Sequence, residues 1–174
     1  MTAPIEFCHW LSGTPGSVAF HESIWVYPIV ESIHVLTLCV FLGLTVMLDL
    51  RLLGAIMSAT PVSRAIRRLL PWMIGGFWVM AASGALLFYA DPVRNYFNIF
   101  FRLKLIFLVT AGLNAAVFHV MASRTIRQWD LDPRPPIRAR LAGGLSLALW
   151  AAVVICGRMT AYRWFDGDLE SLAR

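Results

Sequence analysis

The chain has 174 residues, of which 59% are hydrophobic and only 14% are charged. A soluble domain would be about half apolar and about a quarter charged, so this composition indicates a membrane protein and excludes disordered, collagenous, coiled-coil and disulfide-framework classes. The net charge of +5 does not predict a nucleic-acid partner, because most of the arginines fall into two loops whose charge a membrane explains.

Residues 1–23 are predicted to form a short interfacial segment on the outer side of the membrane. They lack the basic start and the continuous apolar run of a signal peptide. Phe7, Trp10 and Leu11 are side chains suited to the headgroup region.

Four stretches are apolar enough to cross a hydrocarbon core, which needs about 20 helical residues. They cover residues 24–48, 71–90, 101–121 and 141–161. Pro71 is expected in the first turn of the second span, where its missing N–H costs nothing. The dipeptide Asp91-Pro92 is expected to end that helix. Residues 162–174 follow as a solvated tail, and residues 1–174 form a single membrane domain.

The charges of the loops predict the orientation. Nine of the 15 lysines and arginines lie in the segments after the first and third spans, at positions 51, 64, 67, 68, 124, 127, 134, 138 and 140. By the positive-inside rule both segments are cytoplasmic and both termini face outward. The short connections predict an all-α fold, a transmembrane four-helix up-and-down bundle.

Two further local features follow from the sequence. Asp49 and Arg51 are expected to pair at the inner interface, and Gly54 is expected to end the first long helix. Small residues allow membrane helices to approach closely, and we expect such contacts at Gly75, Gly76, Gly112, Gly143 and Gly144.

Ionisable residues inside a bilayer are rare, so each is a candidate functional residue. Pairs of polar side chains share a face on the first, third and fourth spans, and these faces also carry small residues. We therefore expect all of them to turn toward the interior of the bundle. The candidates are Glu31, His34, Lys104, His119, Arg158 and Tyr162.

The candidates nearest the outer side predict a cofactor site. His34 is the predicted ligand of a redox group, b-type haem in the first place, or of a metal ion, with Glu31 as its orienting neighbour. Lys104 and Arg158 would then hold a propionate or another anion. If the chain takes part in catalysis, we expect it to act at most as an electron-transfer subunit. No nucleophile–base pair or phosphate loop indicates a self-contained hydrolase or transferase.

The second ligand of such a group is left open. His119 is a candidate metal ligand, but it lies about 15 Å from His34 in depth, too far for both to bind one iron. Met80 lies at a depth similar to that of His34 and is the alternative partner.

Other functions remain alternatives. Copper or a quinone are the other candidate ligands, since a histidine beside Arg or Tyr can bond a quinone carbonyl. A cofactor-free accessory subunit would instead use Glu31 in an ion pair with Arg158 or Lys104. A metal or proton permeation unit is a third hypothesis. Four helices of this size bury little surface, so we expect a homo-oligomer or partner membrane subunits in the lipid bilayer.

Several motifs together resemble a known family. They are Tyr27-Pro28-Ile29-Val30-Glu31-Ser32-Ile33-His34, Asp49-Leu50-Arg51-Leu52-Leu53-Gly54, Gly84-Ala85-Leu86-Leu87-Phe88, Asn114 with Phe118-His119, and Gly157-Arg158 with Ala161-Tyr162. The chain resembles small four-span bacterial inner-membrane proteins of unknown function, which are distantly similar to copper-resistance D type and cytochrome-b-like membrane bundles. The resemblance covers almost the whole chain, adds Asn114 to the candidate residues and implies haem, copper or quinone chemistry. The chain departs from b-type cytochromes in lacking histidine pairs at matched depth.

Overall fold

A computed structural model of the chain describes residues 3–162. These residues form seven helices and no strand, which confirms the all-α prediction for this part of the chain. From residue 163 onward the predicted tail lies outside the described residues. The helices are α1 (Ala3–Ser12), α2 (Pro15–Glu22), α3 (Val26–Leu53), α4 (Val62–Ala90), α5 (Pro92–Phe97), α6 (Ile99–Trp129) and α7 (Ile137–Met159).

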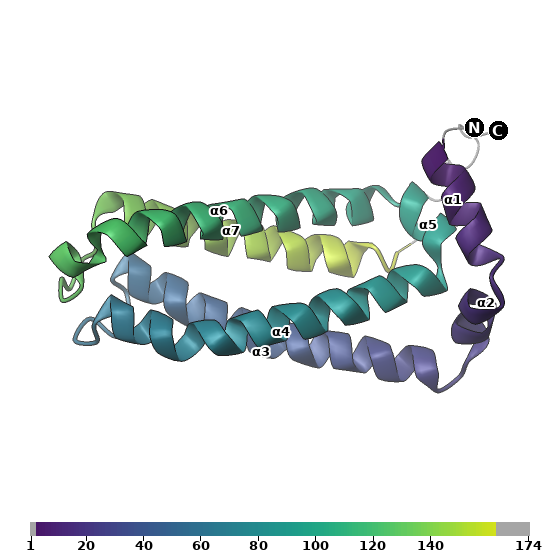
Figure 1. Cartoon of the computed structure of the whole chain (residues 1–174), viewed down its shortest axis with the longest axis horizontal. Helices are drawn as coiled ribbons and strands as arrows, with labels where there is room; N and C mark the ends of the chain where they lie inside the picture. The colour runs from purple at the N-terminus through teal and green to yellow at the C-terminus, as the bar shows by residue number, and fades with distance from the viewer. Residues whose placement is uncertain (1–2, 163–174) are drawn as a thin grey trace.

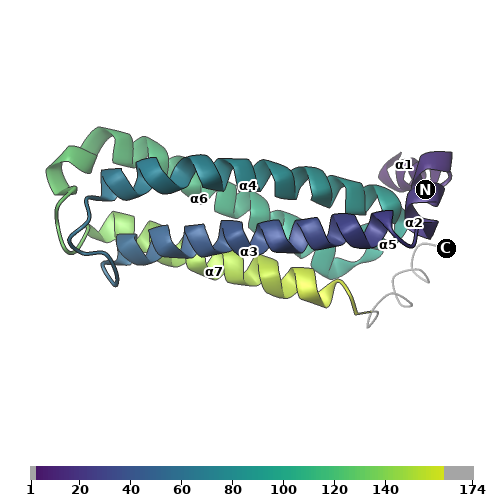
Figure 2. The same cartoon turned by 90° about the horizontal axis from the view of Figure 1, so that it is seen from below.

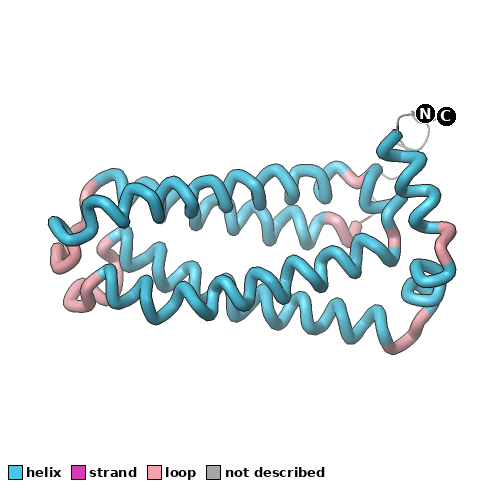
Figure 3. Tube along the Cα trace, viewed as in Figure 1, coloured by secondary structure: helices cyan, strands magenta, loops and turns pink. Residues whose placement is uncertain are grey.

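Four long helices run side by side as a bundle (Figures 1 and 2). Helix α3 packs against α4 and α7, and α6 packs against α7. The α3–α4 and α6–α7 loops lie at one end, here called the arginine-rich end, and α1, α2 and α5 lie at the other, here called the cap end (Figure 3). Helices α3, α4, α7 and the Ile99–Ala122 part of α6 are long and apolar enough to cross a membrane.

The core of the bundle is a cluster of apolar side chains from all four long helices, with Phe41 and Trp150 at its centre. The centroids of these two rings lie 4.7 Å apart in an edge-to-face arrangement. Large apolar side chains such as Leu36, Trp72 and Ile106 point outward and are exposed. An apolar core inside an apolar surface is the pattern expected of helices surrounded by lipid.

Helix α4 begins at Val62, so the prediction that Pro71 lies in a first turn is wrong. Pro71 lies inside the helix, where its missing N–H costs one backbone hydrogen bond. The helix extends past it because the first turn is anchored in a second apolar cluster. In that cluster Val62, 0% exposed, packs with Leu52 and Trp129.

The other helix ends agree in part with the sequence. Gly54 takes the left-handed conformation, with φ 77°, at the end of α3, as predicted. Asp91 ends α4 as predicted and then caps α5, a short helix that we did not anticipate. The predicted span 101–121 agrees with the apolar Ile99–Ala122 part of α6, although the helix itself continues to Trp129. Helix α7 ends at Met159, two residues before the predicted end of the fourth span at 161.

At the cap end, two side chains bind the N-terminal helices to the bundle. Ser17 donates a hydrogen bond to Tyr89 O at 2.7 Å. The hydroxyl of Thr14 lies 3.1 Å from that of Tyr89. These contacts fix α2 against the end of α4, so residues 3–22 are an ordered part of the fold.

Small residues allow close approach at only some of the predicted positions. A Cβ at Gly143 would lie 3.0 Å from Asp49 O and 3.1 Å from Leu52 Cβ, so α7 contacts the backbone of α3 there. A Cβ at Gly75 or at Gly112 would meet nothing within 4 Å. Those two glycines face away from the bundle of this chain.

Candidate functional site

The predicted interior cluster forms only in part. His34 and Lys104 are half-buried, whereas Glu31, Arg158 and His119 are exposed on the surface of the chain. The prediction that all of these side chains turn inward is wrong. Residues three apart differ by about 60° around a helix axis, and that angle is enough to carry Glu31 away from the face of α3 that packs on α4.

The expected ion pairs are also missing. Within residues 3–162, Glu31 makes no ion pair with Lys104 or Arg158, because both Glu31 and Arg158 lie on the outside of the bundle. At the cap end of α7, Arg158 Nη2 instead donates a 3.4 Å hydrogen bond to the hydroxyl of Tyr162. Its guanidinium carbon also lies 5.4 Å from the centroid of that ring.

His34 is held against α4 by Ser83, and we call these two residues with Lys104 the polar centre. His34 Nδ1 lies 2.9 Å from Ser83 Oγ. Ser83 Oγ also lies 2.8 Å from Val79 O and 3.1 Å from Met80 O, either of which can take its hydrogen. When one of them does, His34 Nδ1 donates to Ser83 and the lone pair of the neutral ring is on Nε2.

The contact of His34 with α4 also bears on Met80, the alternative second ligand. A Cβ at Gly84 would lie 3.3 Å from His34 Cε1, so the ring touches the backbone surface of α4. Met80 lies one turn away on that same helix, is 6% exposed and packs with Phe41 and Trp150. A porphyrin plane between His34 and Met80 has no room in this packing.

Lys104 points from α6 toward α7. Its Nζ lies 3.9 Å from the position that a Cβ would take on Gly157. The ammonium is within electrostatic range of the His34 ring. Among residues 3–162 it has no carboxylate partner, although an ammonium inside a bilayer favours an anion.

His119 and Asn114 do not join the polar centre. His34 lies about 12 Å from the cap-end start of α3 (residues 26 to 34), and His119 about 30 Å from that of α6 (residues 99 to 119). This separation agrees with the expectation that the two histidines lie too far apart in depth to bind one iron. Asn114 donates a 3.0 Å hydrogen bond to Ala142 O and so joins α6 to α7.

At the arginine-rich end, Arg51 joins the two loops. Its side chain is 0% exposed. Nε donates to Thr60 O at 2.8 Å and Nη2 donates to Asp132 O at 3.3 Å. The predicted pair with Asp49 is wrong within the described residues, because side chains two apart on a helix point to different sides.

Asp130 caps α4 from another part of the chain. The residue before this helix, Pro61, supplies no side-chain cap. Asp130 Oδ1 instead accepts from Ser63 N–H at 2.7 Å, and Asp130 Oδ2 accepts from Ser63 Oγ at 2.7 Å. Burial by itself would raise the pKa of the Asp130 carboxyl, but these bonds and the charges of Arg67 and Arg51 lower it below its usual value.

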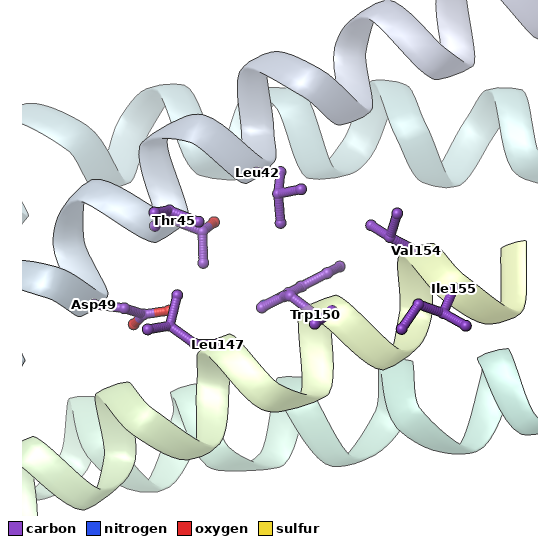
Figure 4. A pocket seen from close by; sticks show the side chains of 9 residues that line it. Leu42, Thr45, Asp49, Leu147, Trp150, Val154 and Ile155 are labelled. Atoms are coloured by element: carbon purple, nitrogen blue, oxygen red, sulfur yellow. The ribbon is translucent and has the colours of Figure 1, made fainter. Parts of the chain in front are cut away.

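The sequence reasoning underestimated Asp49. It is 5% exposed and its Oδ2 has no hydrogen-bond partner among residues 3–162. It lies at one end of a groove of about 360 Å³ between α3 and α7 (Figure 4). The signal was present in the sequence, since Thr45 and Asp49 are four apart on one face of the first span, and both line this groove.

No group of three or more His, Cys, Asp or Glu side chains in residues 3–162 is arranged to hold a metal ion. Any metal at the polar centre would therefore have fewer than three such ligands from residues 3–162, with His34 among them. Comparison of the chain with protein-family models, with curated proteins and with solved structures found no match.

Proposed function

We propose that this chain is an integral membrane subunit for electron transfer that holds a redox-active group through His34. The observation that carries the proposal is the contact of His34 Nδ1 with Ser83 Oγ at 2.9 Å. A neutral imidazole that is oriented by a hydrogen bond at one nitrogen and has its lone pair at the other is the form that binds metals.

A b-type haem is the proposed group, with a single metal ion as the alternative. His34 would be its one ligand from this chain, because Met80 is packed in the core and His119 lies at another depth. We propose that a second copy of the chain or a partner subunit completes the site. Lys104 would pair with a propionate or another anionic group. The haem would supply one-electron chemistry, and the bundle would set its position and surroundings.

The proposal extends to the setting of the protein. The nine arginines at the arginine-rich end favour a cytoplasmic position for that end in a bacterial inner membrane. The cap end, with the polar centre closer to it, would then face the periplasm. Alkaline phosphatase fused after residue 174 is expected to be active, since this enzyme works only outside the cytoplasm, and an inactive fusion would reverse the orientation.

The function is tested on protein purified in mild detergent. Visible spectra are recorded after air oxidation and after dithionite reduction, with metal analysis of the same sample. We expect a Soret band, reduced α and β bands and stoichiometric iron, all lost in His34→Ala. The matched control is His119→Ala, which should keep the spectrum because this histidine is exposed and distant from His34.

Ser83→Ala tests whether the hydrogen bond to His34 influences the bound group. It removes the hydrogen bond that fixes the ring of His34, so it should shift the absorption bands or the reduction potential without abolishing binding. Colourless, metal-free wild-type protein would overturn the proposal and favour the cofactor-free accessory subunit. Stoichiometric copper without haem bands would replace haem by a metal ion at the same histidine.

A further inference from the structure

The groove between α3 and α7 is a second site, separate from the polar centre. Its lining is Leu42, Thr45, Val46 and Asp49 from α3 and Leu147, Trp150, Ala151, Val154 and Ile155 from α7. A volume of about 360 Å³ lies within the size range of small-molecule sites. Asp49 lies 15 residues from His34, or about 22 Å along α3.

One acceptor in this groove is unused. The Asp49 side chain is only 5% exposed. Its Oδ2 has no hydrogen-bond partner among residues 3–162. Thr45, which lines the same groove, donates its own hydrogen to Phe41 O and so does not serve Asp49. Figure 4 shows the Asp49 carboxyl group at one end of the groove, extending from α3 toward α7. Oδ2 is itself buried, so it meets a ligand in the groove only once the carboxyl group rotates toward it. A ligand that donates a hydrogen would then satisfy Oδ2, since a buried acceptor without a partner is costly.

The charges around the groove indicate whether its ligand is anionic, cationic or neutral. The carboxyl group disfavours an anion, and the arginines of the same end of the bundle disfavour a cation. The ligand is therefore neutral. The remaining lining is apolar, with the Trp150 indole on one wall, which suits a flat ring.

Position along the helix indicates an amphiphile. Asp49 lies about 6 Å from the arginine-rich end of α3 (residues 49 to 53), and the groove extends from there about 10 Å toward the middle of the bundle (residues 49 to 42). A polar head would thus lie at Asp49 near one membrane surface, and an apolar tail would extend toward the bilayer centre.

We propose that the α3–α7 groove binds a neutral lipophilic hydroquinone, which donates a phenolic hydrogen bond to Oδ2 of Asp49 and places its ring beside Trp150. The proposal concerns binding alone, with no bond made or broken. It does not depend on a cofactor at His34, and His34→Ala should bind the hydroquinone as the wild type does.

The test uses the full chain purified in detergent micelles, with decyl-ubiquinol as the probe. Bound and free probe are separated and quantified by chromatography under anaerobic conditions. Decyl-ubiquinone has the same ring and tail without the two hydroxyl hydrogens, so we expect it to bind about tenfold more weakly or less. Asp49→Asn should weaken the binding of the quinol by a similar factor and leave the quinone unaffected.

Two matched variants show whether the probe occupies the groove. Ala151→Phe adds bulk to the lining and should abolish binding of both probes. Ala148→Phe adds the same bulk one turn away on α7, outside the lining, and should change nothing. If Ala151→Phe does not fold, the proposal is still tested by comparing the binding of the quinol and of the quinone to Asp49→Asn.

Three results would overturn the proposal. Equal binding of the two probes, unaffected by Asp49→Asn, would mean that the groove accepts any acyl chain by shape. Binding unchanged by Ala151→Phe would mean partition into the micelle. Tighter binding of decylammonium than of the quinol would assign the groove to a cationic amphiphile.

Discussion

The arginine-rich end and the polar centre use polar residues in opposite ways. At the arginine-rich end, Arg51 is completely buried and donates to carbonyl oxygens of both loops, while Asp130 caps α4 with two hydrogen bonds. In the polar centre, nearer the cap end, His34 uses one ring nitrogen for Ser83. Lys104 has no carboxylate partner within the described residues.

This difference separates polar residues that hold the fold from those with capacity left for a ligand. The hydrogen bonds of Arg51 join α3 to both loops, at Thr60 nine residues later and at Asp132 81 residues later. Two of its three side-chain nitrogens are thus used within the fold, while Nη1 has no partner among residues 3–162. The contacts of His34 and Lys104 do not explain why an imidazole and an ammonium lie half-buried in an apolar bundle. Arg51 and the polar centre should therefore respond oppositely to mutation: large losses of stability at Arg51, and small effects or gains at the polar centre.

The largest effect is expected for Arg51→Ala. This change removes the two hydrogen bonds that join α3 to the α3–α4 and α6–α7 loops, and it leaves a space in a fully buried site. The free energy of unfolding should fall by about 3 kcal/mol, measured by thermal or denaturant unfolding in micelles. Arg64→Ala is the matched control, because Arg64 lies at the same end but is exposed, and it should change stability by less than about 0.5 kcal/mol. Equal effects of the two changes would contradict the special role of Arg51.

Gly143→Ala should have the next largest effect. The added Cβ would lie 3.0 Å from Asp49 O and 3.1 Å from Leu52 Cβ, neither of which can move without shifting α3. We expect a loss of about 2 kcal/mol, measured in the same unfolding experiment. Gly112→Ala meets nothing within 4 Å and should be neutral or slightly stabilising. Tolerance of alanine at 143 would show that α3 and α7 are not in close contact there.

Asp130→Ala should show a smaller loss that depends on pH. Hydrogen bonds from Ser63, with the charges of Arg67 and Arg51, hold the Asp130 pKa below its usual value. A lowered pKa in the folded state adds stability that is present above the unfolded pKa of about 3.9 and is lost as the pH falls through the folded pKa. The variant should thus lose about 1 kcal/mol at pH 7.

The difference between this variant and the wild type should shrink below about pH 4, when unfolding is followed across pH. Asp132→Ala is the control, since Asp132 contributes its backbone oxygen to Arg51 rather than its carboxylate. A difference that stays constant with pH would mean that Asp130 acts through packing.

Lys104→Met should raise the stability of the protein, in contrast to the preceding substitutions. The side chain keeps its length but loses an ammonium that has no carboxylate partner in the described part of the bundle. The ligand-free protein should gain about 1 kcal/mol, while any bound anionic group should be held less tightly. A loss of stability in ligand-free protein would instead give Lys104 a structural role like that of Arg51.

Composition, hydrophobic run length and turn residues were sufficient to predict four long helices and the glycine that ends α3. They did not predict that α4 begins at Val62, because its cap is Asp130, 68 residues later in the chain. Helical spacing puts Thr45 and Asp49, four residues apart, on one face of α3, and both line the groove. It failed for Glu31 and Arg158, because spacing relates residues on one helix but does not reveal which face meets a neighbour.

Arg158→Gln should have the smallest effect. Its guanidinium is exposed and contacts Tyr162 four residues away, with a 3.4 Å hydrogen bond and a cation–π distance of 5.4 Å. Exposed pairs of this kind contribute about 0.5 kcal/mol or less, so unfolding in micelles should barely change. A loss comparable with that of Arg51→Ala would mean that Arg158 is buried in the assembled protein, against a second copy or a partner. The polar centre would then be completed by Arg158 from the outside, since no contact of this residue within the described chain accounts for such a loss.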